Sequence, residues 1–258
     1  MTSTVLPAPV PPSRLANALA SEWTKIRSVQ STIWTFATMF ATVLGIGLMA
    51  DLYQRGRDDV GSYLGLGVGG FIIGTIPVVT LGVLVISSEY GTGMIRTTLT
   101  AYPRRTSLLT AKALVLFGLT FALGTLAVGT QVLGGMVLLS GQGVDPSAGQ
   151  IALAVIGGGL YLALIGLFAL GVGTLLRHSA GAIATMLGLL LMPFILAVLM
   201  PLADLRDLLL TYSPINMSAS LFGDGAGSTN GWALLGILAL GTAAVLGGAY
   251  AAILRRDV

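Results

Sequence analysis

Charged side chains are concentrated in two short stretches of an otherwise uncharged chain. Residues 14–27 (RLANALASEWTKIR) hold Glu22 close to Lys25. Residues 87–114 (SSEYGTGMIRTTLTAYPRRTSLLTAKAL) carry four basic residues and a single acid, Glu89. Carboxylates and cations grouped in this way suit ion pairing and the docking of a partner, so both stretches are candidate functional sites.

Residues that could catalyse a reaction are nearly absent. The single histidine, His178, follows Arg177 in a short polar stretch, and we interpret it as a basic residue rather than a catalyst. The sequence has no cysteine, no HExxH motif, no GxxxxGK[ST] phosphate-binding motif and no recognisable nucleophile–histidine arrangement. We therefore predict that the chain is not an enzyme and holds no catalytic residue, metal or cofactor.

Composition predicts the class of protein that positions these groups. Of 258 residues, 55% are hydrophobic and 9% are charged, and the mean hydropathy is +0.91. Soluble domains carry about 25% charged residues, so this chain could not cover its surface in water. We predict an all-α integral membrane protein, and the net charge of +3 is too small to indicate nucleic acid as a partner.

Six uncharged runs of 23 to 32 residues divide the chain. A helix needs roughly 20 apolar residues to cross the hydrocarbon core, so each run fits one span. Transmembrane β-strands would be about 10 residues long with alternating hydrophobicity, which these runs lack. The predicted transmembrane domain covers residues 14–258, with spans at 30–50, 62–86, 110–139, 150–176, 180–201 and 231–254.

Lys and Arg are distributed unequally between the two sides of these spans. Ten lie on the side that holds both termini, and three lie on the other side. Because cytoplasmic loops are enriched in Lys and Arg, we predict cytoplasmic termini in a plasma-membrane protein. Residues 1–13, with four prolines and no charge, predict a disordered tail.

Residues 14–27 predict an amphipathic helix along the membrane interface. Its apolar stripe is formed by Leu15, Leu19, Trp23 and Ile26. Glu22 falls within that stripe, and two interpretations remain open. The carboxylate either reaches solvent at the rim of the helix or pairs with a cation of the cytoplasmic loops.

Residues 94–102 predict a second short amphipathic helix on the cytoplasmic side. Ile95, Leu99 and Tyr102 form its apolar face, and Arg96 lies off that face. Gly91 and Gly93 would turn the chain out of the second span, and Pro103 would end the helix. The basic residues that follow, Arg104, Arg105 and Lys112, are expected near lipid headgroups. Such a helix either floats on the membrane or docks a soluble partner.

Polar residues inside the spans are scarce. No Asp, Glu, Lys or Arg falls in the middle of a run, which argues against a proton- or sodium-driven carrier. Gln131 is the most polar residue at depth and is expected to form an interhelical hydrogen bond. The spacings Gly65-x-x-x-Gly69 and Gly70-x-x-x-Gly74 are weak signals of close helix packing.

Two segments carry a family resemblance. SEWTKIRSVQSTIWT before the first span and SSEYGTGMIRTTLTAYPRR after the second resemble the permease subunits of bacterial ABC type-2 transporters. The resemblance implies that the segment after span two couples to a separate ATPase subunit, which would bind ATP and Mg. It assigns coupling to Glu89, Tyr90, Gly93, Ile95, Arg96, Leu99 and Tyr102, and places the N-terminal helix residues Glu22, Trp23, Lys25 and Arg27 beside them.

One further expectation follows from the resemblance, and two follow from the residues themselves. Short helices outside the membrane are expected between spans five and six, where Leu205, Leu208 and Leu209 give an apolar face. A second permease copy should complete the pathway, with glycines of span two allowing close approach. Glu89 is expected to pair with Arg27, Lys112 or Arg177 and to fix the angle of the coupling helix.

The sequence thus predicts the permease of an ATP-driven exporter. Its cargo stays open among lipids, polysaccharides, peptides and drugs. The main alternative is a membrane scaffold or sensor that recruits a cytoplasmic partner through the same helix. A membrane-embedded lipid-modifying enzyme is a third class, which the missing catalytic residues argue against.

Overall fold

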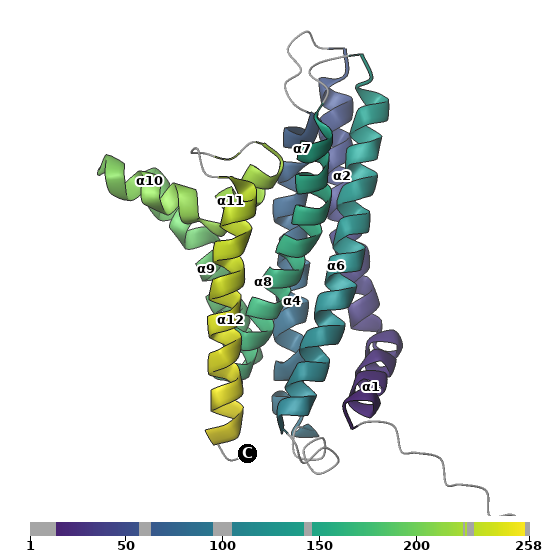
Figure 1. Cartoon of the computed structure of the whole chain (residues 1–258), viewed down its shortest axis with the longest axis vertical. Coiled ribbons are helices and arrows are strands. Elements are labelled where there is room, and N and C mark those ends of the chain that lie inside the picture. The colour runs from purple at the N-terminus through teal and green to yellow at the C-terminus, as the bar shows by residue number, and fades with distance from the viewer. Residues whose placement is uncertain are drawn as a thin grey trace, which may run out of the picture.

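The computed structural model describes residues 14–56, 63–94, 105–141, 146–223, 225 and 230–255, and these are helical with no β-strand among them (Figure 1). The elements in chain order are α1 (Arg14–Ser28), α2 (Gln30–Gln54), α3 (Tyr63–Leu66), α4 (Val68–Gly91), α6 (Arg105–Leu138), α7 (Ala148–Ala152), the π-helical turn η1 (Leu153–Gly157), α8 (Gly158–Leu176), α9 (Ser179–Leu199), α10 (Ala203–Tyr212), α11 (Pro214–Leu221) and α12 (Gly231–Arg255). The predicted tail, residues 1–13, lies outside the described residues.

Six helices in the described chain are long and apolar enough to cross a membrane. They are α2, α4, α6, the continuous helix from α7 to α8, α9 and α12. The prediction of an all-α fold with six spans is therefore confirmed. The start of α1 and the end of α12 lie at the same end of the bundle, as an even number of spans requires (Figure 1).

Three spans extend beyond their predicted bounds, because their helices include charged residues near the ends. The second span, α4, ends at Gly91 instead of residue 86, and α6 begins at Arg105 instead of residue 110. The first span continues to Gln54 instead of ending at residue 50. The extensions of α2 and α4 bring Asp51 and Glu89 inside helices, and Lys112 lies within α6 as predicted; all three are buried. The spans are thus free of acids and bases only in their central parts.

Local capping sets several helix starts. Ser147 begins α7 with a capping box, because its Oγ accepts from the Gln150 backbone N–H while the Gln150 side chain accepts from the Ser147 N–H. Ser213 caps α11, where Pro214 occupies the first turn. His178 caps α9, since its Nδ1 accepts a hydrogen bond from the Gly181 N–H at 2.9 Å. The histidine therefore has a structural role as a helix cap.

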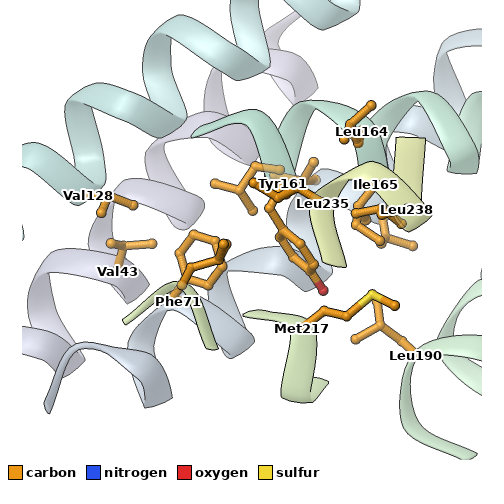
Figure 2. Packing of buried hydrophobic residues seen from close by; sticks show 14 of the residues in the cluster. Val43, Phe71, Val128, Tyr161, Leu164, Ile165, Leu190, Met217, Leu235 and Leu238 are labelled. Carbon is orange, nitrogen blue, oxygen red and sulfur yellow. The ribbon is translucent and has the colours of Figure 1, made fainter. Parts of the chain in front are cut away.

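Helices α4 and α8 form the centre of the bundle. Helices α2 and α6 pack against them on one side, and α12 packs against α8 on the other (Figure 1). Phe71 of α4 contacts Tyr161 of α8 and Phe222 after α11, with ring centroids 5.6 and 5.0 Å apart. Figure 2 shows Phe71 and Tyr161 side by side in this core. The Tyr161 hydroxyl donates to the Pro214 carbonyl at 2.9 Å, which ties α11 to the core.

Glycines of the second span pack against helices of the same chain. A Cβ on Gly70 would lie 2.8 Å from the Thr42 carbonyl oxygen, and one on Gly74 would lie 2.7 Å from Val43. A Cβ on Gly82 would meet the Gly166 backbone of α8. The expectation that span-two glycines lie at a dimer contact is therefore wrong for these three positions.

Two short helices, α10 and α11, connect the fifth and sixth spans, as the resemblance implied. Helix α10 projects from the bundle at the end opposite the described termini (Figure 1). Its predicted apolar face stays uncovered in the single chain, because Leu205 and Leu208 are exposed.

Candidate functional site

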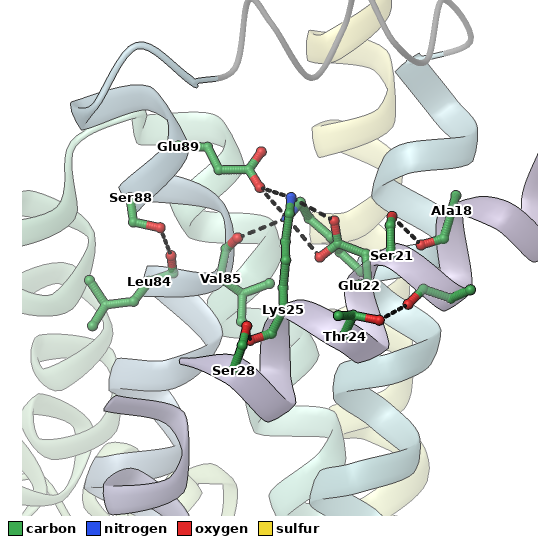
Figure 3. A network of polar contacts seen from close by, with 12 residues as sticks. Ala18, Ser21, Glu22, Thr24, Lys25, Ser28, Leu84, Val85, Ser88 and Glu89 are labelled. Carbon is green, nitrogen blue, oxygen red and sulfur yellow. Dashed lines mark hydrogen bonds and ion pairs between the residues drawn. The ribbon is translucent and has the colours of Figure 1, made fainter. Parts of the chain in front are cut away.

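Four charged side chains from three helices meet at the end of the bundle that holds α1 (Figure 3). They are Glu22 and Lys25 of α1, Glu89 of α4 and Lys112 of α6, and we call them the charge cluster. Lys112 Nζ lies 2.7 Å from Glu89 Oε1 and 3.0 Å from Glu22 Oε2. Lys25 Nζ lies 2.9 Å from Glu89 Oε1 and 3.1 Å from Glu22 Oε1. Each carboxylate thus contacts both ammonium groups, and the cluster is neutral as a whole.

Lys112 is the centre of the charge cluster. The residue is 2% exposed, and its ammonium group also donates to the Val85 carbonyl at 3.2 Å. An ammonium group has three N–H donors, and Glu22, Glu89 and Val85 supply three acceptors. A buried cation is tolerated when its charge is paired and its donors are satisfied, which is the arrangement here.

The two acids are buried almost as deeply as Lys112. Glu22 is 3% exposed and Glu89 is 6% exposed. Glu22 lies on the face of α1 that packs against the bundle, next to Ala18, whose small buried side chain permits close approach. Of the two interpretations of Glu22, pairing with a cation is therefore confirmed, but the cations are Lys25 of α1 itself and Lys112 of α6 rather than residues of a loop.

Lys25 lies at the edge of the charge cluster, where its side chain is 38% exposed. Partial burial by itself lowers the pKa of Lys25. The hydrogen bond to Glu89 and the negative charges of Glu22 and Glu89 outweigh that effect, so the pKa of Lys25 is raised above its ordinary value. Lys25 is accordingly charged at neutral pH.

The residue after Glu89 attaches α4 to a different part of the bundle. The guanidinium carbon of Arg177 lies 5.2 Å from the centre of the Tyr90 ring, a cation–π contact. Arg177 is in the left-handed conformation (φ 54°) between α8 and α9, and its backbone N–H donates to the Gly173 carbonyl. Glu89 and Tyr90 thus connect the last turn of α4 to α1, α6 and the α8–α9 turn.

The chain leaves α4 through Gly93. Its φ of +72° is a backbone conformation that side chains with a Cβ disfavour. The preceding Thr92 closes the helix, since its N–H and hydroxyl both donate to the Ser88 carbonyl at 3.0 and 2.8 Å. The predicted turn at Gly93 is confirmed, whereas Gly91 belongs to the helix itself.

Several predicted site residues fall outside this arrangement. Ile95, Arg96, Leu99 and Tyr102, and with them the predicted coupling helix, lie outside the described residues, as does the Arg27 side chain. Trp23 is 45% exposed and lies outside the packed face of α1. Lys112 was expected at the lipid headgroups, which is wrong because it is enclosed by α1, α4 and α6. The predicted pairing of Glu89 with Lys112 is confirmed, and Arg177 contacts Tyr90 instead.

The charge cluster has no catalytic geometry of its own. Both carboxylates are occupied by ammonium groups, and no group of three His, Cys, Asp or Glu suited to a metal ion occurs in the described part of the chain. What the arrangement can do is transmit force, because it joins three helices through short, charge-assisted contacts.

Sequence comparison agrees with this reading of the bundle. The profile of the ABC-2 family transporter proteins matches residues 18–176, which run from α1 through α8 and include the whole charge cluster. No curated protein gives a match to the chain. The profile covers more than half of the sequence and four of its six candidate spans. The chain therefore belongs to the ABC-2 transporter family and is a multi-pass membrane protein, a permease component of an ABC transporter.

Proposed function

We propose that the chain is the permease of an ATP-driven exporter, which receives the movement of a separate ATPase subunit through residues 89–105. The observation that carries the proposal is the charge cluster. It holds Glu89, in the last turn of α4, to α1 and α6 immediately before the segment expected to dock the ATPase. ATP and Mg would be bound by the partner, where hydrolysis would take place.

The contacts of α4 favour rigid-body coupling. A push on the docking segment reaches the Gly93 turn and then the last turn of α4. Because that turn is bound to Lys25, Lys112 and Arg177, α4 would move together with α1, α6 and the α8–α9 turn. Rocking of such a packed unit against its partner is a common way to open a transport path.

Charge distribution supports the orientation that this function needs. The chain has more Lys and Arg flanking the helix ends on the side of its termini than on the opposite side. The charge cluster lies at that same end, which the positive-inside rule predicts to face the cytoplasm, where an ATPase subunit would bind.

A second copy of the permease is part of the proposal. Because Gly70, Gly74 and Gly82 of α4 pack against α2 and α8 of the same chain, a second copy would have to approach other surfaces of the bundle. Helix α9, the fifth span, exposes large apolar side chains including Met192 and Val198. We predict that cysteines placed along this helix crosslink two copies of the permease in the membrane.

Recovery of the ATPase subunit with the tagged permease tests the docking step. Leu99→Asp places a charge on the predicted docking face and should weaken association at least tenfold, about 1.4 kcal/mol. Leu208→Asp is the matched control, since Leu208 is an exposed leucine of α10 at the other end of the bundle. Equal recovery with both variants and the wild type would contradict docking through residues 89–105 and favour a membrane-surface float.

A further inference from the structure

At the end of the bundle opposite the charge cluster, α2 carries a carboxyl group enclosed by the protein. Asp51 has 0% exposed surface, and Gln131 of α6 beside it is 1% exposed. Gln131 Nε2 donates a hydrogen bond to Asp51 Oδ2 across 3.4 Å. The other oxygen, Oδ1, accepts no hydrogen bond from the part of the chain that the structure describes.

Glycines of α2 and α6, and the glycine between α3 and α4, make room for this pair. A Cβ on Gly47 would lie 2.6 Å from Gln131 Cγ, and one on Gly67 would lie 2.5 Å from Gln131 Oε1. A Cβ on Gly135 of α6 would lie 3.2 Å from Asp51 Oδ2. Larger residues at Gly47 and Gly67 would overlap the amide, so the close packing depends on them.

No cation faces Asp51 within the described residues. On its own helix, Tyr53 and Arg55 are both exposed. The described ionisable residues of the helices packed nearby, Glu89 and Tyr90 of α4 and Lys112 of α6, belong to the opposite end of the bundle. Asp51 makes no ion pair with any described residue, and its polar side-chain contact is the neutral amide of Gln131.

The charge cluster provides a comparison inside the same chain. Glu22 and Glu89 are buried, and each has ammonium groups within 3.1 Å. Asp51 is buried more completely and has no such group among the described residues. An ionised carboxylate without a cation is strongly disfavoured in such surroundings, and it becomes neutral by taking up a proton. This enclosure is provided by protein atoms and does not depend on the lipid around the bundle.

We propose that Asp51 is a proton-binding site between α2 and α6. The carboxylate takes one proton from water and becomes a carboxylic acid, so that the charge of the site changes from −1 to 0. The neutral acid remains enclosed between the two helices. Release of the proton creates a charge that needs water, and it therefore favours separation of α2 from α6 at this end. The proposal concerns the permease alone and does not depend on ATPase coupling.

Labelling with dicyclohexylcarbodiimide, an apolar reagent for protonated carboxyl groups, tests the proposal. The full chain in lipid nanodiscs would be labelled over a range of pH and mapped by peptide mass spectrometry. Asp51 should be labelled at acidic and neutral pH, and above its titration the labelling should fall about tenfold per pH unit. Glu22 and Glu89 should stay unlabelled because their carboxylates are ion-paired.

Two substitutions at Gln131 should move the labelling in opposite directions. Gln131→Met removes the donor that favours the carboxylate, so labelling of Asp51 should persist to higher pH. Gln131→Lys supplies a cation and should abolish labelling at neutral pH. Absence of labelling at Asp51 at every pH in both the wild type and Gln131→Met would overturn the proposal. Protection by sodium at constant pH, compared with choline, would also overturn it, because the occupant would then be a metal cation.

Thermal unfolding provides a second measurement that labelling chemistry does not affect. Asp51→Asn keeps the shape of the neutral acid and cannot ionise. If the folded chain holds the proton more tightly than the unfolded chain, wild-type stability decreases relative to Asp51→Asn as the pH rises. Parallel pH profiles for the two proteins would contradict proton binding at Asp51.

Discussion

Lys112 shows how a full charge is held among apolar helices in this molecule. Its three donors meet Glu22, Glu89 and the Val85 carbonyl, and little of the residue is exposed. Removing one charged residue from such a site destabilises the fold, because the remaining charges stay buried without a partner of opposite charge.

Lys112→Met should therefore destabilise the fold by about 3–5 kcal/mol, the usual range for breaking a buried ion pair. Lys25→Met is the matched control and should have a smaller effect, since the Lys25 side chain is 38% exposed and solvent screens its charge. Unfolding of both variants in the same lipid would compare them. If both variants lowered the free energy of unfolding equally, the burial of Lys112 would not explain the stability of the charge cluster.

The raised pKa of Lys25 predicts a definite pH dependence. A lysine whose pKa is raised on folding contributes stability that is fully present below its unfolded value, near 10.5. That stability is lost as the pH rises through the higher pKa of the folded chain. The wild type should therefore lose its advantage over Lys25→Met only in strongly alkaline solution. A loss that is already complete at neutral pH would contradict the ion pairs of Lys25.

At the scale of elements, the last turn of α4 contacts α1, α6 and the α8–α9 turn through its side chains. Glu89 and Tyr90 hold it to other helices, and Gly93 directs the chain away from it. The turn that follows α4 thus depends on one backbone conformation.

Gly93→Ala should be destabilising by roughly 1 kcal/mol, because a residue with a Cβ is strained at this φ of +72°. No atom within 4 Å would clash with the new Cβ, so the effect comes from the backbone alone. Gly91→Ala also has open space but is helical, and it should be neutral or slightly stabilising. Comparison of the two variants by thermal unfolding separates strain from side-chain effects, and identical results would contradict the role of the turn.

The positions of the spans could be predicted from the sequence better than the contacts between them. A span requires a long apolar run whatever surrounds it, so α2, α4 and α6 could be found from composition. The ends of α2 and α4 could not, because Asp51 and Glu89 continue these helices by meeting polar groups of other helices. The pairing of Glu89 could be narrowed to three cations on one side of the membrane. Which of the three cations meets Glu89 depends on how α4 is rotated relative to α6. That rotation cannot be derived from a single sequence.

At the scale of the whole molecule, topology is the prediction on which the function depends. Because the chain has no cysteine, single cysteines can be introduced without background. Cysteines at Asp58, Pro146 and Asp224 should react with an impermeant maleimide added to intact cells, whereas those at Ser107 and His178 should not. Labelling at Ser107 from outside would reverse the orientation and place the charge cluster away from the ATPase.

Assembly and coupling can be separated at the charge cluster. Glu89→Gln removes a charge that touches both lysines, while the predicted docking residues are unchanged. The double variant Glu89→Gln/Lys25→Gln keeps the cluster neutral. It controls for a loss of activity that is caused by misfolding around an unbalanced buried charge. Asp204→Asn, an exposed acid of α10 at the opposite end, is the matched control.

The most direct test of the coupling role is ATP hydrolysis by the permease–ATPase complex reconstituted in nanodiscs, normalised to the amount of ATPase bound. We expect Glu89→Gln and the neutral double variant to bind the ATPase as the wild type does and to hydrolyse ATP several-fold more slowly. Asp204→Asn should match the wild type in both measurements. Wild-type hydrolysis by both Glu89 variants, with the ATPase fully bound, would contradict the proposal that the charge cluster transmits movement between the ATPase and the bundle.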